Sequence, residues 1–156
     1  MTKFRIWKPL LAGLCGTTVH LALMSLKSSM GWLPAFQPYE SLQHAFGQWV
    51  GTNVSPVVPW MLSFVNGTAV LSVLFARTNR FLPGRNGITK GVSFGLAGWA
   101  LMSLIMFPLI GLGPFAVRVG LGVAPALFSL AMLLTYSIAM AAVYIALEKC
   151  ITEGSA

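Results

Sequence analysis

Acidic residues are almost absent from this chain. Its 156 residues contain no aspartate and three glutamates, Glu40, Glu148 and Glu153. A Ser-His-Asp triad therefore lacks its aspartate, and none of the long apolar stretches holds a carboxylate for acid–base catalysis. We expect the protein not to be an enzyme, and the sequence predicts no catalytic residue.

Metal ligands are equally scarce. The chain has two histidines, His20 and His44, and two cysteines, Cys15 and Cys150, none of them at a ligand spacing. The glycines of residues 111–122 do not form a phosphate-binding loop, because no lysine follows them. We therefore predict neither a metal site nor a nucleotide site.

Charged residues of either sign make up 8% of the chain, whereas soluble domains carry about 25%. Hydrophobic residues make up 56%, and the mean hydropathy is +0.79. This composition places the protein in the bilayer. The net charge is +7, but the basic residues flank the apolar runs, so we expect contact with membrane lipids and not with nucleic acid.

Four apolar runs predict an all-α integral membrane four-helix bundle that forms a single transmembrane domain over residues 1–156. The spans are expected at about 9–26, 56–76, 91–110 and 121–147. The first run covers about 27 Å as a helix, which is just enough to cross the hydrocarbon core. No cleavage site follows it, so we expect a retained helix and not a signal peptide.

The basic residues lie mainly on one side of the predicted spans. That side carries Lys3, Arg5, Lys8, Arg77, Arg80, Arg85, Lys90 and Lys149, and the other side carries Lys27 and Arg118. The positive-inside rule then predicts that both termini are cytoplasmic. Arg77, Arg80, Arg85 and Lys90 are expected to meet anionic lipid head groups or a partner's acidic surface. Lys27 is expected to extend to the outer interface.

A short amphipathic helix is predicted at about 38–50, between the first two spans. Tyr39, Phe46 and Trp49 recur at helical spacing on one face. Such a helix would lie flat on the membrane surface, with these aromatic residues contacting lipid or a partner. A packed cap over the bundle is a second interpretation, and the two are compatible.

His20 is the histidine placed inside an apolar span, and it shares a helix face with Ala12 and Gly16. One hypothesis is that the imidazole ligates haem or bacteriochlorophyll, with Gly16 leaving room for the macrocycle. Another is a hydrogen bond to a neighbouring helix, for instance to Asn66. A third is a wet cavity.

Two further patterns concern helix packing and repetition. Gly91 and Gly95 form a small-xxx-small pair that would let a neighbouring helix approach closely. The letters ALMSL occur at both Ala22–Leu26 and Ala100–Leu104. They indicate either a duplicated two-helix hairpin or a chance match of common membrane residues.

Short motifs in the first and third spans, and after them, carry a family resemblance. They are Met24-Ser25-Leu26-Lys27, Met30-Gly31, Pro34, Trp99, Pro108, Gly111, Gly113 and Phe115. With them the chain resembles an uncharacterised family of small four-span bacterial membrane proteins. Members carry His-x-x-Tyr-Gly in the last span, where this chain has Thr-Tyr-Ser-Ile-Ala at residues 135–139. The resemblance implies the topology and a bacterial origin, and it brings no activity.

The leading functional prediction is a non-catalytic accessory or structural subunit of a larger complex in the bacterial inner membrane, without a cofactor. Its expected partners are lipids and other membrane subunits. One alternative is a small transporter or channel, for which His20, Asn66 and scattered Ser and Thr residues would form the polar path. The other is a pigment- or haem-binding protein that uses His20.

Overall fold

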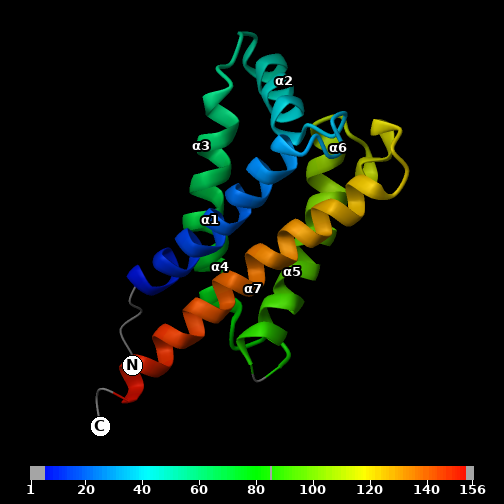
Figure 1. Ribbon diagram of the computed structural model, residues 1–156. Helices are drawn as coiled ribbons and strands as arrows, with labels where there is room; N and C mark the ends of the chain where they lie inside the picture. The colour runs from blue at the N-terminus through cyan, green and yellow to red at the C-terminus, as the bar shows by residue number, and fades with distance from the viewer. Residues whose placement is uncertain (1–5, 85, 154–156) are drawn as a thin grey trace.

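The computed structural model describes residues 6–84 and 86–153, and the described part is helical without strands (Figure 1). Four of its helices are long and apolar enough to cross a membrane. They are α1 (Trp7–Ser29), the continuous run of α3 (Val57–Val65), η1 (Asn66–Leu71) and α4 (Ser72–Thr78), the run of α5 (Gly87–Leu101), η2 (Met102–Met106) and α6 (Phe107–Leu109), and α7 (Ala124–Glu153). The predicted all-helical class, with four helices long and apolar enough to span a membrane, is confirmed.

The longest helix, α7, is central in the bundle. It packs along both α1 and α5, and α1 also contacts η1 and α4 (Figure 1). The start of α1 and the end of α7 lie at the end of the bundle that holds the α4–α5 connection. Helix α2 (Pro38–Val50) and the short helix η3 (Pro114–Val119) lie at the opposite end, called here the α2 end. Towards the α2 end, α3 diverges from α1 (Figure 1).

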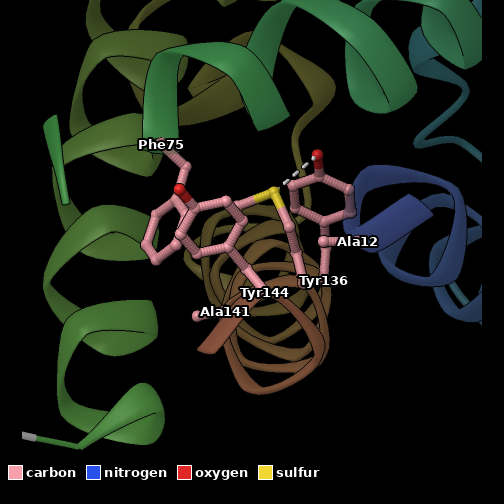
Figure 2. Packing of buried hydrophobic residues seen from close by; sticks show 6 residues of the cluster. Ala12, Phe75, Tyr136, Ala141 and Tyr144 are labelled. Carbon is pink, nitrogen blue, oxygen red and sulfur yellow. Dashed lines mark hydrogen bonds between the residues drawn. The ribbon is translucent and has the colours of Figure 1, made fainter. Parts of the chain in front are cut away.

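An apolar core fills the half of the bundle away from α2 (Figure 2). The ring of Phe75 packs edge-to-face on the rings of Phe94 and Tyr144, with centroids 5.3 Å and 5.6 Å away. The hydroxyl of Tyr136 lies 3.4 Å from the sulfur of Met140. The buried members of this core are Ala12, Phe75, Tyr136, Met140, Ala141 and Tyr144. Aromatic rings and sulfur therefore close this half of the bundle.

The contact between α5 and α7 depends on the two predicted glycines, which are both buried. A Cβ atom on Gly91 would lie 2.8 Å from the Cα atom of Ile138 and 2.8 Å from the carbonyl oxygen of Ser137. A Cβ atom on Gly95 would lie 3.2 Å from the side chain of Ser137. The predicted close approach at this small-xxx-small pair is confirmed.

Two of the four spans contain a π-helical segment that the sequence interpretation did not predict. Segment η2 ends directly before α6, in which Pro108 has no N–H to donate to the carbonyl of Leu104. The wider turn of a π-helix relieves the clash between the proline ring and the preceding turn. In η1, the hydroxyl of Tyr136 donates a hydrogen bond of 2.5 Å to the carbonyl of Gly67.

A second apolar cluster closes the α2 end. Its buried members are Phe36, Ala45, Phe107, Ile110, Leu112 and Ala116. Phe115 and Ala116 adopt left-handed φ angles of 52° and 60°, and the ring of Phe115 packs 5.4 Å from that of Trp99. Because Ala45 belongs to this cluster, the predicted helix at 38–50 caps the bundle. Its position at a membrane surface stays a prediction.

The two ALMSL copies lie in different surroundings. The first is in the regular helix α1, where Ser25 is exposed. The second extends into η2, where Ser103 is fully buried. The local structure therefore gives no support for a duplication.

The α5–α7 contact predicts how two glycine substitutions differ. Gly91→Ala should lower the free energy of unfolding by about 1–3 kcal/mol, because its Cβ would meet backbone atoms of α7 that cannot move aside. Gly98→Ala is the matched control, since its Cβ would lie 3.5 Å from the Leu133 side chain. The control should be neutral or stabilising, because alanine favours helix. Unfolding in detergent checks both, and equal effects would contradict this packing.

Candidate functional site

A cavity of about 200 Å³ lies where α3 diverges from α1, between these helices and α7. Polar groups of His20, Tyr39, Ser63 and Asn66 contribute to its wall. The apolar part of the wall includes Met24, Met102, Met132, Phe36, Phe107 and Phe128. An apolar space with a few polar groups is the usual form of a small-molecule site. No group of described His, Cys, Asp and Glu residues could hold a metal ion.

His20 is partly buried in the cavity wall. Its ring packs edge-to-face on the ring of Tyr136, with the centroids 6.4 Å apart. Within residues 6–84 and 86–153, neither ring nitrogen makes a hydrogen bond, so the predicted bond to a neighbouring helix is not formed. Asn66 is exposed on the surface of the bundle. His20 therefore contributes a hydrogen-bonding group to the cavity that the protein itself does not use.

The space beside Gly16 is occupied by Tyr136. A Cβ atom on Gly16 would lie 2.9 Å from the ring of Tyr136 and 3.0 Å from its carbonyl oxygen. The clearance expected there for haem or bacteriochlorophyll is thus filled by protein. The cavity is also smaller than the roughly 300–1,000 Å³ typical of sites for drug-sized ligands. The geometry does not fit a macrocycle on His20.

Tyr39 of α2 faces α3, and not a lipid or partner surface as expected. Its ring stacks on that of Trp60 at 4.3 Å, and its hydroxyl lies 3.1 Å from the hydroxyl of Ser63. Burial raises the pKa of Tyr39 above its ordinary value, and the bond to Ser63 offsets this in part. Phe46 and Trp49 pack on each other, and Trp49 is largely exposed.

Lys27 turns into the bundle and does not extend outwards as predicted. Only 4% of its surface is exposed. Its Nζ donates a hydrogen bond of 2.6 Å to the carbonyl of Phe36. The same Nζ lies 5.6 Å from the ring centroid of Phe36 and 6.0 Å from that of Phe128, within reach of a cation–π attraction. Lys27 thereby fixes a ring that belongs to the cavity wall.

The basic residues of the α4–α5 connection lie at the opposite end from the cavity. Arg77 and Arg80 are exposed, and Lys90 is partly buried. The guanidinium of Arg80 lies 4.5 Å from the ring centroid of Phe81. Arg85 lies outside the described residues. Contact of this loop with anionic lipid or a partner stays a prediction.

Sequence reasoning missed Tyr136 as a site residue. Its ring faces His20 and fills the space beside Gly16, and its hydroxyl binds the carbonyl of Gly67. The available signal was a tyrosine in the middle of an apolar span, since a buried tyrosine hydroxyl needs a hydrogen-bond partner. That signal does not identify the partner.

The chain matches a family of unknown function, DUF6789, over residues 5–153. No curated protein and no solved structure matches the chain.

The bond between Tyr136 and Gly67 can be tested by substitution. Tyr136→Phe removes a hydroxyl from a buried site and leaves the Gly67 carbonyl without its side-chain donor. We expect the free energy of unfolding to fall by about 1–2 kcal/mol. Tyr144→Phe is the control, because it removes a bond to Glu148 that is only partly buried. A loss no larger than that of the control would contradict the role given to Tyr136.

Proposed function

The chain belongs to DUF6789, a family whose function is unknown, and we propose its function from the cavity: a non-catalytic membrane subunit that binds a small neutral ligand inside the bundle. The observation that carries this proposal is the cavity itself. It joins an apolar wall to the hydrogen-bonding groups of His20 and Asn66.

The size and chemistry of the wall define the ligand. An engineered cavity of about 150 Å³ accepts a benzene molecule, so about 200 Å³ suits one or two small rings. Neither a lysine nor a carboxylate lines the cavity, which favours an uncharged molecule. His20 and Asn66 would bind a polar group on it. Because Asn66 is exposed on the bundle surface, the ligand would enter sideways from the lipid.

We propose the bacterial inner membrane as the location, with both termini cytoplasmic. The distribution of basic residues supports this orientation. The accessory role in a larger assembly is supported by the small mass outside the four spans. It is also supported by the exposed apolar side chains of α3, such as Met61 and Val65, which can face lipid or another subunit.

Binding is favoured over transport by the packing of the other half of the bundle. A transport path needs polar groups across the whole membrane. Beyond Tyr136, however, the core consists mainly of apolar side chains and aromatic rings, including the fully buried Phe75 and Met140, and the hydroxyls of Ser72 and Ser137 are isolated polar groups in it. A ligand in the cavity would therefore meet a packed wall and not a continuous path.

Imidazole NMR can test the proposed site, because the chain has two histidines. We expect naphthol, a neutral two-ring alcohol, to shift the signals of His20 and to leave those of His44 unchanged, since His44 is exposed on α2. At a hundredfold excess over its Kd, naphthol should also raise the free energy of unfolding by about 2–3 kcal/mol.

Two variants and one hydrocarbon serve as controls for this experiment. His20→Phe keeps a ring but loses both nitrogens, so it should lose most of the stabilisation by naphthol. His44→Gln should behave like the unchanged protein. Naphthalene has no polar group and should bind more weakly than naphthol. Equal shifts at both histidines would indicate partition into the detergent and would refute a site at the cavity.

The accessory role is tested separately by purification from native membranes in mild detergent. We expect the protein to elute in a stable complex with other membrane proteins. Substitution of the exposed Met61 or Val65 by lysine should release it if α3 forms the contact, because lysine in an apolar interface is left unpaired. A protein that always elutes alone would argue against this role.

A further inference from the structure

Lys27 carries a positive charge that has no counter-ion in the described part of the chain. It is 96% buried, and it forms no ion pair with Glu40, the acid of the neighbouring helix α2. The carbonyl of Phe36 and the rings of Phe36 and Phe128 supply only partial negative charge. The Lys27 ammonium has three N–H donors, and one of them donates a hydrogen bond to the Phe36 carbonyl. A buried cation in this state calls for an anion.

A second space of about 220 Å³ adjoins Lys27, between α1 and α7. Its wall is apolar apart from Lys27 and the hydroxyl of Thr135. The other residues that line it are Leu23, Leu26, Trp32, Phe128, Ala131 and Met132. The α7 residues of the wall recur at helical spacing over about 10 Å. Because Leu26, Trp32 and Ala131 are exposed, this groove opens on the side of the bundle.

The depth of Lys27 matches that of lipid head groups. Helix α1 has 23 residues and is about 34 Å long, slightly more than the roughly 30 Å hydrocarbon core. Lys27 lies in its last turn, so if α1 crosses the membrane as predicted, the ammonium would lie at the boundary between acyl chains and head groups. The remainder of the groove extends along α7 from Phe128 to Thr135, towards the middle of that helix.

We propose that the α1–α7 groove binds an anionic lipid, with its anionic oxygen head on the Lys27 ammonium and its acyl chain along Leu23 and Ala131. A fatty acid carboxylate and a phospholipid phosphate share this chemistry. This site differs from the His20 cavity. The head group of the lipid would bind the charged Lys27, and its acyl chain would lie on the surface of the bundle. It does not depend on the function proposed above.

Fluorescence quenching tests this proposal, because Trp32 lies in the groove. The protein is reconstituted in phosphatidylcholine vesicles that contain dibrominated stearate, dibrominated phosphatidylglycerol or dibrominated phosphatidylcholine. The quenching that belongs to Trp32 is obtained by comparing the tryptophan fluorescence of the unsubstituted protein with that of Trp32→Phe. We expect anionic lipid to be preferred over phosphatidylcholine about fivefold, which is what one basic residue contributes near an anionic lipid. High salt should leave the preference unchanged, because Lys27 is buried.

Variants of Lys27 separate charge from structure. Lys27→Gln keeps a donor for the carbonyl of Phe36 but removes the charge, so the anionic preference should be lost. Lys27→Arg keeps the charge and should keep the preference. Lys90→Gln, near the start of α5 at the other end of the bundle, is the control and should change nothing. Unfolding curves show whether each variant is folded. If a variant does not fold, the comparison of anionic and neutral lipids in the unsubstituted protein still tests the proposal.

Each outcome decides the matter. Preferential quenching by stearate alone identifies a fatty acid, and by phosphatidylglycerol alone a phospholipid; either supports the site. Quenching that is equal for anionic and neutral lipid overturns the proposal. A folded Lys27→Gln that keeps the anionic preference also overturns it. Shifts of the His20 signals by naphthol test the other site and do not decide this proposal.

Discussion

The hydrogen bond from the Lys27 ammonium to the Phe36 carbonyl connects the end of α1 to the segment that leads into α2. Because Phe36 is held there, its ring can pack edge-to-face on Phe107, at 5.9 Å, and on Phe128, at 6.5 Å. These rings contribute to the wall of the cavity and to the cluster that closes the α2 end. One buried cation therefore determines how the loop, the cap and the cavity fit together.

The opposite half of the bundle has a different physical basis. There, glycine and alanine let α1 and α5 approach α7, and Tyr136 joins the two halves. Its ring borders the cavity beside His20, while its hydroxyl binds the carbonyl of Gly67 in η1. Tyr136 therefore belongs both to the closely packed half of the bundle and to the half that contains the cavity. The π-helical segment at this point allows α3 to diverge from α1.

Sequence reasoning was most successful where hydrophobicity alone decides. The four spans and the helix at Pro38–Val50 follow from apolar runs, periodicity and helix-starting prolines. The contact at Gly91 follows from residue size. The direction of Lys27 could not be predicted, because it depends on a carbonyl that the fold brings near. Tyr136 was missed for the same reason, since its partner Gly67 is 69 residues away.

The two spaces at the α2 end are physically connected through α7. Phe128 and Met132 line both of them, one helical turn apart. The ring of Phe128 also lies near the Lys27 ammonium. Phe128 thus lies beside the ammonium and borders both the His20 cavity and the α1–α7 groove. Packed side chains respond to the loss or gain of a neighbouring group by discrete rearrangement and not by continuous deformation. A lipid chain in the groove would therefore limit the positions of Phe128 and Met132, and through them the shape of the cavity beside His20.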